Sequence, residues 1–363
     1  MEGARKIDTQ LLVLGHHVDV VCLDSPQENF LADYPATVHA LGPSILSYNY
    51  NKKLLPWIKE HRKKYDAVIV NGIWQYHSFA AWRALSDTDT PYYVFTHGML
   101  DPWFKKQYPY KHLKKWLYWL WSEYKVLRDA KAVIFTSEEE RVSSRKSFWL
   151  YRSNEAVTMY GTSSPPTNSK ELSNIFLEKH PHLKGKRLVL FLSRIHEKKG
   201  CDLLLEAFSK ISKSGDDLHL VMAGPDQSGW VKKLKIESER LGLTDKITWA
   251  GMLTGDMKWG AFYAAEVFCL PSHQENFGIV VAEALACGKI VLISNKINIW
   301  REIESDAAGF VDDDSVAGTV RNFQRWLELD LNSFNEMTER SRQCFAQRFH
   351  IHRAAERLIE IIS

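Results

Sequence analysis

The chain has 363 residues, of which 45% are hydrophobic and 25% are charged, and its formal net charge at pH 7 is +3. A chain of this length can form two domains, each with its own buried core. The composition is that of a globular protein, and so small a net charge gives no global indication of nucleic-acid binding.

Cysteine usage and the lack of long apolar runs bear on the cellular compartment. The five cysteines are odd in number, widely spaced and without a Cys-x-x-Cys pair, which argues against a disulfide framework or a zinc site. No run approaches the roughly 18 apolar residues that span a bilayer, and residues 1–6 lack an apolar signal region. The sequence therefore predicts a cytoplasmic protein, either free or peripheral on the inner face of the cytoplasmic membrane.

Short apolar runs typical of strands alternate with helical patterns in two series, which is the signature of parallel, doubly wound sheets. The expected strands are 18–23, 67–71, 92–96, 132–136 and 156–159 in the first series, and 187–192, 218–223, 247–250, 267–270 and 290–293 in the second. A stretch rich in Pro and Ser, 161–170, separates the two series. The expected organisation is a first domain at 1–164, a linker at 165–185, a second domain at 186–333 and a closing helix at 334–363.

Two loops in the first half carry candidate side chains directly after predicted strands. Asn71 ends one strand and Trp74 follows it, where its ring is a candidate platform for an acceptor. His97 follows another strand, and Gly98 behind it permits an abrupt turn, so His97 is expected to face a cleft between the domains. A single histidine after a strand is more often structural, so this interpretation depends on the residues around it.

Aromatic and basic residues are interleaved from Trp103 to Arg128. One set has helical spacing and is expected to face the core: Leu113, Trp116, Leu117, Leu120, Tyr124 and Leu127. The lysines of the segment and Trp119 then remain for the outer face. Two interpretations stay open, namely a packed helix with a solvated face and a surface that docks on an anionic membrane.

The run Ser137-Glu138-Glu139-Glu140 offers a cluster of carboxylates after a predicted strand. A Ser followed three residues later by Glu is also the pattern of a capping box at a helix N-terminus. We interpret the run as such a helix start, with Ser137 and Glu140 as the reciprocal pair.

The loop after the predicted strand 187–192 is basic. In a doubly wound sheet, ligands bind beyond the carboxyl ends of the strands, and here Arg194 can contact two phosphate oxygens while Lys199 adds a point charge. The alternative is a solvated charged loop. Gly224 and Gly251 follow two other strands and can let a backbone approach a ligand closely, although glycine turns after strands are common.

The most informative stretch of the chain, 271–288, holds two glutamates eight positions apart around a loop-to-helix junction. Pro271 ends an apolar strand, and 277–286 has the pattern of a helix buried on most faces. The helix start offers free backbone N–H groups to an anion, while Glu275 in the loop and Glu283 in the helix can accept from hydroxyls on either side. The alternative is an ordinary strand, loop and helix with one glutamate as a cap and the other on a wet face.

Three of these elements together resemble a known family. The stretch around Glu275 and Glu283, with its Pro-Ser, Phe-Gly and Ala-Cys-Gly, resembles an E-x7-E motif. Arg194 and Lys199 match a Gly/Ser-Arg-x4-Lys-Gly element, and the string His-Gly-Met-Leu-Asp-Pro-Trp that starts at His97 resembles the signature of one branch. Over nearly its whole length the chain is similar to the retaining glycosyltransferases of the GT-B fold, group 1, also called glycosyltransferase family 4.

The resemblance implies two Rossmann-like doubly wound domains that face each other across a cleft, with the helix at 334–363 crossing back to the first domain. It implies metal-independent transfer of a hexose, with retention, from a nucleotide diphosphate sugar to a glycan or lipid-linked acceptor, in surface or extracellular polysaccharide biosynthesis. No cofactor is expected. The Asp312-Asp313-Asp314 run lies where the family has a turn before a helix, so we do not interpret it as a metal site.

The resemblance also implies the roles of individual residues. Catalytic roles fall to His97 and Glu275. Donor-binding roles fall to Arg194, Lys199, Glu275, Asn276, Phe277, Gly278, Ile279, Glu283, Gly224 and Gly251. Acceptor-side candidates are Gly3, Asn71 and Trp74.

The start of the chain departs from the family pattern. Family members open with a strand and a glycine pair before the helix that leads to a Gly-His-x-Val-x-Val-Val strand; here that strand is 15–21, and of the earlier elements only Glu2 and Gly3 precede the helix. We therefore expect the first domain to lack its first, central strand and to expose apolar neighbours, either because the recorded start codon is too far downstream or because this is a truncated copy. Two alternatives stay open: a GT-B nucleotide-sugar epimerase or hydrolase, and an inactive, N-terminally truncated homologue that binds sugar nucleotides.

Overall fold

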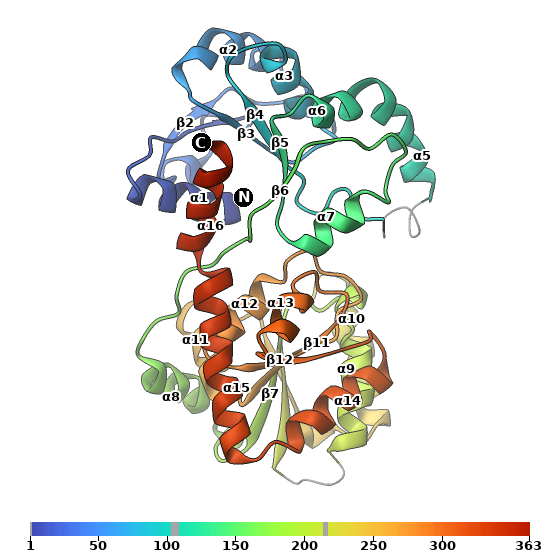
Figure 1. Ribbon diagram of the computed structural model, residues 1–363. Helices are drawn as coiled ribbons and strands as arrows, with labels where there is room; N and C mark the ends of the chain where they lie inside the picture. The colour runs from blue at the N-terminus through green and yellow to red at the C-terminus, as the bar shows by residue number, and fades with distance from the viewer. Residues whose placement is uncertain (1, 103–108, 213–216) are drawn as a thin grey trace. The chain divides into compact units, whose positions relative to one another are not determined.

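The computed structural model describes residues 2–102, 109–212 and 217–363, which form two compact units. Unit 1 comprises Met1–Gly161 and Ile351–Ser363, and unit 2 comprises Thr162–His350. The chain leaves unit 1, builds the whole of unit 2 and returns with helix α16 (Ile351–Ile362), drawn in red in Figure 1. Each unit is an α/β structure built on parallel strands.

The strands of unit 1 form two separate parallel sheets. The larger sheet pairs four strands in this order: β3 (Val68–Asn71), β4 (Tyr92–Phe95), β5 (Ala132–Phe135) and β6 (Glu155–Val157). The smaller sheet pairs β1 (Asp19–Cys22) with β2 (Thr37–Ala40). Upstream of β1 the described residues form helix α1 (Glu2–Val13).

Helices cover both faces of the unit 1 strands. On one face, α1 and α16 contribute Ile7 and Leu358 to a cluster with Tyr93. On the other face, α3 and α6 contribute Ala81 and Val126 to a cluster with Val94. Because neighbouring residues of β4 enter opposite clusters, this strand is apolar throughout, as expected for a strand buried on both faces.

The helical segments of unit 1 between these strands are α2 (Leu54–His61), α3 (Tyr76–Leu85), α5 (Pro109–Tyr118), the π-helical turn η3 (Trp119–Glu123), α6 (Tyr124–Arg128) and α7 (Glu138–Ser144), with short 3-10 turns at Asn29–Leu31 and Arg62–Lys64.

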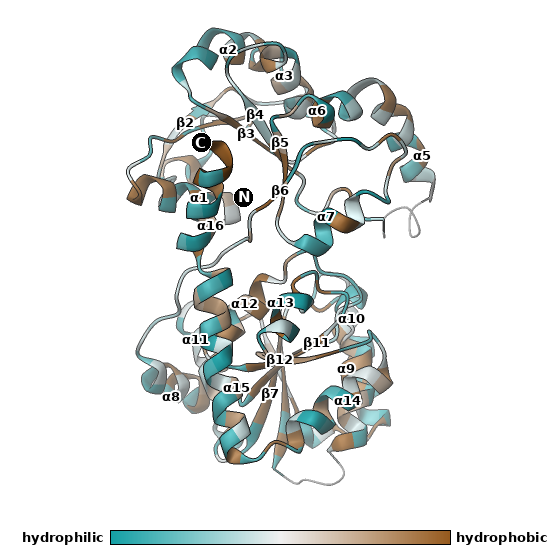
Figure 2. Ribbon diagram, viewed as in Figure 1, coloured by the Kyte–Doolittle hydropathy of each residue, from teal (hydrophilic) through white to brown (hydrophobic). Residues whose placement is uncertain are grey.

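Unit 2 contains a six-stranded parallel sheet. Its strands pair in this order: β12 (Gly309–Asp312), β11 (Ile290–Ser294), β10 (Val267–Leu270), β7 (Arg187–Leu192), β8 (Leu218–Ala223) and β9 (Ile247–Gly251). The strand order reverses between β7 and β10, which is the point at which doubly wound sheets bind ligands beyond the carboxyl ends of their strands. In Figure 2 these strands are predominantly brown, the colour of hydrophobic residues.

The helices of unit 2 are α8 (Ser169–Lys179), α9 (Cys201–Ile211), α10 (Trp230–Arg240), α11 (Gly255–Ala264), α12 (Ile279–Ala286), α13 (Trp300–Ser305), α14 (Val316–Leu327) and α15 (Leu331–Cys344). After α15 comes a π-helical turn, Phe345–Phe349. None of the helices in the described parts of the chain is long and apolar enough to cross a membrane.

The segment expected as a linker, 165–185, is folded into unit 2 instead. Its helix α8 packs against α11 and buries Leu172 and Phe176. The two helices approach so closely that a Cβ on Gly260 would lie 2.3 Å from Leu172 O. Its Pro- and Ser-rich start suggested a linker, but the apolar spacing of its helix gives it a place in the core.

Candidate functional site

Two loops of unit 2 follow the neighbouring strands β7 and β10 and are joined by hydrogen bonds. The first loop ends in a 3-10 turn, Glu197–Lys199, and the second begins at Pro271. Ser272 Oγ and His273 N both donate to Lys198 O at 2.8 Å. The joined loops therefore lie at the point where the strand order reverses.

Lys199 and Glu275 come from these two loops and form an ion pair in which Lys199 Nζ donates to Glu275 Oε2. Lys199 is only 6% exposed. Burial, with the charges of Arg194 and Lys198, lowers the pKa of Lys199 to about 8. Arg194 is exposed on the same loop as Lys199. The structure thus brings together three of the residues predicted for donor binding.

Glu283 lies inside α12 and is buried, at 4% exposure. Its Oε1 accepts from Lys258 Nζ at 2.6 Å. Its Oε2 is buried and has no hydrogen-bond partner among the residues that the structure describes. A buried carboxylate oxygen without a donor carries a free-energy cost, so Oε2 is an acceptor that a ligand hydroxyl could satisfy.

Gly278 lets the loop that carries Glu275 turn directly into α12. Its backbone is left-handed, with φ of +74°, and it stands at the N-cap before Ile279. A Cβ on Gly278 would lie 3.1 Å from Ile297 Cγ2 and 3.3 Å from Glu275 Cγ. A residue with a side chain would be strained here by both its backbone and its neighbours.

The same loop is fixed in unit 2 by three further contacts. Glu275 N donates to Lys296 O at 3.0 Å. Asn276 Oδ1 accepts from Asn298 Nδ2 at 3.3 Å. Phe277 is buried, with its ring 5.7 Å from that of Phe349. Asn276 and Phe277 therefore support the position of Glu275 through contacts with their own unit.

Gly224 and Gly251 set the spacing of strand ends. A Cβ on Gly224 would lie 1.7 Å from Ser193 O, so the close approach at this glycine is made by the protein's own backbone. Gly224 N donates to Gly251 O at 2.7 Å. The sequence pattern of a glycine after a strand does not distinguish this arrangement from the approach of a ligand.

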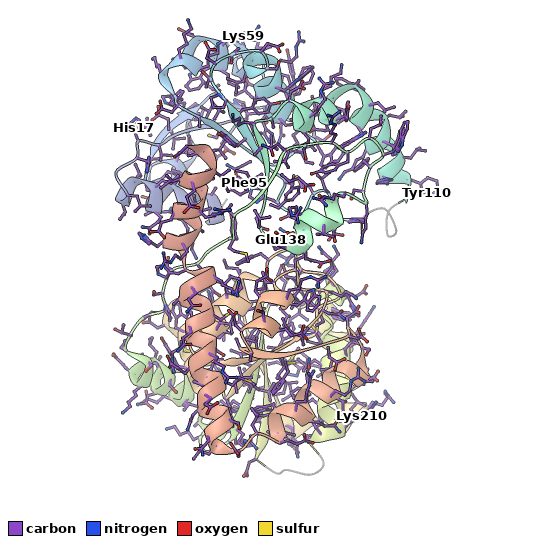
Figure 3. The ribbon with its side chains drawn as sticks, in the orientation of Figure 1. His17, Lys59, Phe95, Tyr110, Glu138 and Lys210 are labelled. Atoms are coloured by element: carbon purple, nitrogen blue, oxygen red, sulfur yellow. The ribbon has the colours of Figure 1, made fainter. Side chains whose placement is uncertain are left out.

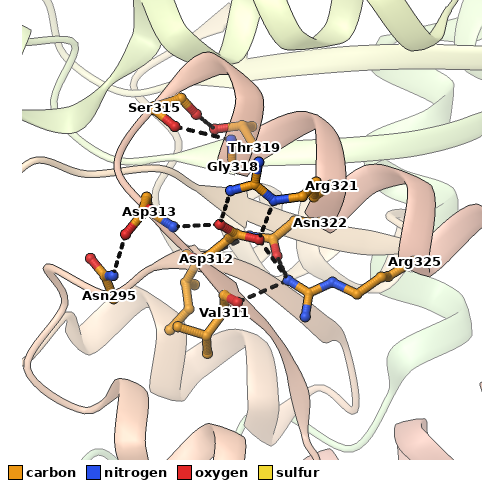
Figure 4. Close-up of polar contacts among 11 residues, drawn as sticks. Asn295, Val311, Asp312, Asp313, Ser315, Gly318, Thr319, Arg321, Asn322 and Arg325 are labelled. Atoms are coloured by element: carbon orange, nitrogen blue, oxygen red, sulfur yellow. Dashed lines mark hydrogen bonds and ion pairs between the residues drawn. The ribbon is translucent and has the colours of Figure 1, made fainter.

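Asp312, the last residue of β12, and Asp313 after it are paired with other side chains of unit 2, as Figure 4 shows. Asp312 accepts from Arg321 and Arg325, and its hydrogen bonds with Arg321 hold its pKa below the usual range. Asp313 Oδ1 accepts from Asn295 Nδ2 at 2.8 Å. Among the described residues there is no group of three or more His, Cys, Asp or Glu side chains placed to hold a metal ion.

In unit 1, His97 follows β4 and has a left-handed backbone with φ of +46°. Such a conformation is uncommon for a residue with a side chain and is concentrated at functional sites. The ring stacks on Phe95 with centroids 5.4 Å apart, and Nε2 lies 3.0 Å from Asn71 Oδ1. Burial lowers the pKa of His97, so its imidazole is neutral near pH 7. The predicted residues His97 and Asn71 are therefore in contact.

Glu140 has a role that the capping-box interpretation missed. Ser137 Oγ accepts from Glu140 N at 3.1 Å, so the predicted helix cap is confirmed. The Glu140 carboxylate, however, accepts from Thr96 Oγ1 at 2.7 Å and Gly98 N at 2.5 Å, and also from the backbone and side chain of Thr136. These contacts take the place of the expected return bond to Ser137. They tie the ends of β4 and β5 together and hold the loop after β4.

Trp74 is held by a buried acid that the sequence gave no reason to select. Its backbone N donates to Glu123 Oε1 at 3.0 Å, and Ser78 Oγ donates to the same oxygen at 2.9 Å. Burial raises the pKa of Glu123 to about 7. The Trp74 ring packs 5.2 Å from Phe148, with Lys115 Nζ 4.7 Å from its centroid. Part of the Trp74 ring, the proposed platform for an acceptor, is thus already covered by other side chains of unit 1.

Gly3, the remaining acceptor-side candidate, lies in the first turn of α1. A Cβ on Gly3 would lie 1.6 Å from the hydroxyl oxygen of Tyr160. The residue that it approaches closely is therefore one of unit 1 itself.

The helical stretch α5–η3 is turned about its axis relative to the prediction. Of the side chains expected in the core, Leu127 is buried there and Trp116 and Tyr124 pack against it. Leu113, Leu117 and Leu120 were also expected in the core, but they are 63%, 66% and 43% exposed. Trp119 was expected outside and is fully buried. Two stripes of this stretch have helical spacing, and the buried stripe is the one with the polar Glu123, whose hydrogen bonds allow its burial. The predicted lysines at 105 and 106 lie outside the described residues.

The exposed apolar side chains of this stretch form a strip that we call the outer strip. Its members are Tyr110, Leu113, Leu117, Leu120 and Trp121. Tyr110 points away from the body of unit 1 in Figure 3.

Two family models match the chain. A model described as "Glycosyl transferases group 1" matches residues 173–344, and one described as "Glycosyl transferase 4-like domain" matches residues 7–158. Each match covers most of one structural unit.

Several curated proteins have related sequences. D-inositol 3-phosphate glycosyltransferase of Segniliparus rotundus is 31% identical over 111 residues, which are 30% of this chain and 24% of that protein. Phosphatidyl-myo-inositol mannosyltransferase of Mycobacterium leprae is 32% identical over 136 residues, 36% of this chain and 35% of that protein. Alpha-D-kanosaminyltransferase of Streptomyces kanamyceticus is 25% identical over 53% of this chain and 49% of that protein. The matches thus span between about a quarter and a half of these relatives.

Solved structures show the fold over almost the whole chain. Anabaena Alr3699/HepE in complex with UDP has a TM-score of 0.78 at 17% identity, over 99% of this chain and 94% of that one. Sucrose-phosphate synthase from Thermosynechococcus elongatus has a TM-score of 0.74 at 21% identity, over 98% and 91%. The fold is therefore GT-B, built from two Rossmann-like units. The chain belongs to the group 1 glycosyltransferases.

Proposed function

We propose that this protein is a retaining, metal-independent glycosyltransferase that moves a hexose from a nucleotide diphosphate sugar to a glycan or lipid-linked acceptor, in polysaccharide biosynthesis. The observation that carries the proposal is the contact between Lys199 and Glu275, which joins the cationic loop after β7 to the acidic loop after β10. In such a site the cation can bind a diphosphate, while the carboxylate can accept hydrogen bonds from the hydroxyls of the sugar.

The positive groups of unit 2 suit the leaving group of such a reaction. When the bond between sugar and diphosphate breaks, negative charge develops on the diphosphate and must be stabilised. Arg194 and Lys199 offer two cations on one loop, and the start of α12 at Ile279 offers backbone N–H groups. In our proposal these groups take the part that a metal ion plays in other sugar transferases.

On the acceptor side, the proposal places His97 at the reaction centre and Asn71 beside it. The neutral imidazole can donate or accept a hydrogen bond without adding a charge, and its contact with Asn71 fixes the ring. UDP in the complex with HepE and the inositol acceptors in the names of two relatives support a nucleotide-linked donor and a hydroxyl acceptor.

A test of donor binding follows from the unpaired oxygen of Glu283. We expect Glu283 to accept from a ribose hydroxyl, because all common donors carry a ribose. Glu283→Gln should then raise the Kd of the nucleotide by about 10-fold or more, since a hydrogen bond to a charged group contributes roughly 1.5–3 kcal/mol. The measurement is titration calorimetry. UDP, GDP and ADP are first compared on the unmodified protein, and the nucleotide that binds most tightly is then titrated into both proteins.

The 2′-deoxy and 3′-deoxy forms of the same nucleotide make this test specific. If Glu283 contacts the ribose, at least one of these should bind the unmodified protein weakly and should lose little further affinity in Glu283→Gln. Glu266→Gln is the matched control, because Glu266 pairs with Arg187 at a more exposed position of the same unit. Equal losses for ribose and both deoxyribose forms would contradict the assigned contact. Tight binding without transfer to any acceptor would favour the non-catalytic alternative.

We further propose that the outer strip docks unit 1 on a membrane that presents a lipid-linked acceptor. Exposed apolar side chains are gathered here, beside the exposed Lys114 and Arg128. An apolar helix face with flanking cations is the arrangement that lies in the interface of an anionic bilayer.

The double variant Leu113→Ser/Leu117→Ser should lower the bound fraction on anionic vesicles by about 10-fold, because burial of each leucine contributes roughly 1.5–3 kcal/mol at most. Flotation with phosphatidylglycerol vesicles at low salt measures it. Leu331→Ser, at another exposed leucine that lies in unit 2, is the matched control and should float like the unmodified protein. If the unmodified protein stays in the soluble fraction, membrane docking is contradicted.

A further inference from the structure

A cavity of about 570 Å³ lies in unit 2, beside the first turns of α8 and the last turns of α11 and α12. Helix α8 packs against α11 and α15 packs against α12, and all four helices lie on the left of unit 2 in Figure 1. Three cationic side chains line the cavity, namely Lys170, Lys289 and Arg342. Among the described residues, no Asp or Glu lines it. The cavity is therefore positively charged.

This cavity is separate from the joined loops after β7 and β10. Those loops lead into the N-terminal end of α12 at Ile279, whereas Ala286 and Cys287, at its C-terminal end, line the cavity. The helix has 8 residues, so its two ends are about 12 Å apart. The proposed donor site and the cavity thus lie at opposite ends of one helix.

Helix α8 contributes a polar face to the cavity. Ser169, Lys170, Ser173 and Asn174 line it, and they form two pairs at i, i+4, which lie on the same side of a helix. The apolar side of α8 is buried against α11. The hydroxyl and amide groups of the polar face can donate hydrogen bonds to an anion beside the cations.

Lys289 is a half-buried cation whose hydrogen bonds are made to neutral groups. Its Nζ donates to Tyr263 O at 3.1 Å and to Ala265 O at 2.7 Å. These bonds use two of the three donors of the ammonium group. Burial lowers the pKa of Lys289 to about 8, because it disfavours the charged form. A bound anion would accept from the third donor and stabilise the charge.

Arg342 lies against the turn that ends α12. A Cβ on Gly288, whose φ is +68°, would lie 2.7 Å from Arg342 Cζ, so the guanidinium would have to move if position 288 had a side chain. Besides burial, the charge of Arg342 lowers the pKa of Lys289, so the two cations repel each other. Arg342 Nη1 donates to Glu339 Oε2 at 3.2 Å, but this pair is exposed and leaves other guanidinium donors for a ligand. An anion between Arg342 and Lys289 would relieve their repulsion.

Carbonyl groups at the ends of the two helices, which would repel an anion, have donors of their own. At the end of α12, Gly288 N donates to Leu285 O at 2.8 Å and Lys289 N donates to Ala284 O at 2.9 Å. At the end of α11, Lys289 Nζ itself covers two carbonyl oxygens. The negative ends of both helix dipoles are thus offset close to the cavity.

We propose that this cavity binds a phosphate monoester, with the phosphate between Lys289 and Arg342. Such a group has three acceptor oxygens and a charge of about −1.5 to −2 at pH 7, which suits three cations and several hydroxyl donors. The volume of the cavity is in the range of small-molecule sites, roughly 300–1,000 Å³. A free small molecule and a lipid headgroup can both carry this group. The proposal does not depend on the proposed glycosyl transfer.

The test compares two carriers of the same phosphate group on the full chain. Glycerol 3-phosphate is the free monoester, and phosphatidic acid in phosphatidylcholine vesicles is the lipid-bound one, with pure phosphatidylcholine vesicles as the background. Hydrogen exchange of the amides at 169–174 and 286–290 is measured as each carrier is titrated. With an effective carrier at about 10 times its Kd, exchange at both segments should slow by up to about 10-fold.

The double variant Lys170→Ala/Arg342→Ala removes two cations from the cavity, and both are exposed, so the fold should persist. It should raise the Kd of the effective carrier by at least about 10-fold, because hydrogen bonds to charged groups are the strong ones. Lys179→Ala/Arg340→Ala is the matched control. It removes the same charge from exposed positions of the same two helices, outside the cavity, and should bind like the unmodified protein.

Slowing by glycerol 3-phosphate would identify a free small molecule as the ligand, and slowing by phosphatidic acid vesicles alone would identify a lipid headgroup. No slowing with either carrier would overturn the proposal, and so would slowing confined to the donor loop at 275–279. An unchanged Kd in Lys170→Ala/Arg342→Ala would also overturn it. Equal losses in the two double variants would do the same, because binding would then follow the overall charge of unit 2.

Discussion

Replacement of Glu275 by Gln is expected to reduce kcat for sugar transfer by about 10²–10³-fold, the size of effect that follows from losing one charged group at a reaction centre. Gln keeps the shape of the side chain but removes the carboxylate that pairs with Lys199. Because Lys199 is buried, loss of its carboxylate partner should lower the pKa of Lys199 relative to the unmodified protein. As the pH rises, Lys199 loses its proton and its positive charge, and the transfer activity should decline. In Glu275→Gln this decline should begin at a lower pH than in the unmodified protein.

The measurement is steady-state transfer from the tightest-binding nucleotide sugar across pH 6 to 9, with circular dichroism to monitor the fold. Glu237→Gln is the matched control, since Glu237 forms an exposed ion pair with Arg240 in the same unit and such pairs contribute little. Normal turnover in Glu275→Gln would refute the role assigned to Glu275.

Removal of the Glu140 carboxylate should have the largest effect on stability. Glu140→Ala would leave the donors of Thr96, Gly98 and Thr136 unpaired in the interior, and we expect the free energy of unfolding to fall by about 3 kcal/mol. Glu140→Gln, which keeps an acceptor, should lose less. Urea denaturation followed by circular dichroism measures both.

Glu138→Ala is the control from the same helix, where Glu138 is exposed and pairs with Arg141; its effect should be under about 1 kcal/mol. If Glu140 positions His97, then Glu140→Gln should also lower kcat by more than the control does, at a temperature at which the variant is fully folded. An unchanged stability in Glu140→Ala would contradict the hydrogen-bond network itself.

The strand pattern could be read from the sequence because parallel strands buried on both faces are short, continuous apolar runs. The run 218–223, for example, coincides with β8. β2 and β12 escaped prediction. β2 (Thr-Val-His-Ala) has no such run, and β12 has only Phe310 and Val311. The prediction for Leu113, Leu117 and Leu120 was wrong because apolar spacing alone favoured a side that is exposed, while hydrogen bonds bury the side with Glu123.

The candidate site was predictable where its residues are close in sequence and form a recognisable spacing, as Glu275 and Glu283 do. The contact of Lys199 with Glu275 joins residues 76 positions apart, and that of Glu140 with Thr96 joins residues 44 positions apart. Such pairs depend on which strands become neighbours, and local patterns do not encode that. The contacts of the buried Glu140 carboxylate, and Glu123 altogether, were missed for this reason.

The path of the chain has a consequence for how the protein folds during synthesis. Unit 1 needs α16 to complete the cluster that contains Ile7 and Tyr93, yet all of unit 2 is translated before α16. Unit 2 can thus fold on the ribosome while one face of unit 1 still waits for its last helix. During that interval the apolar side chains of this face remain open to water, which makes the nascent first unit a natural client for chaperones.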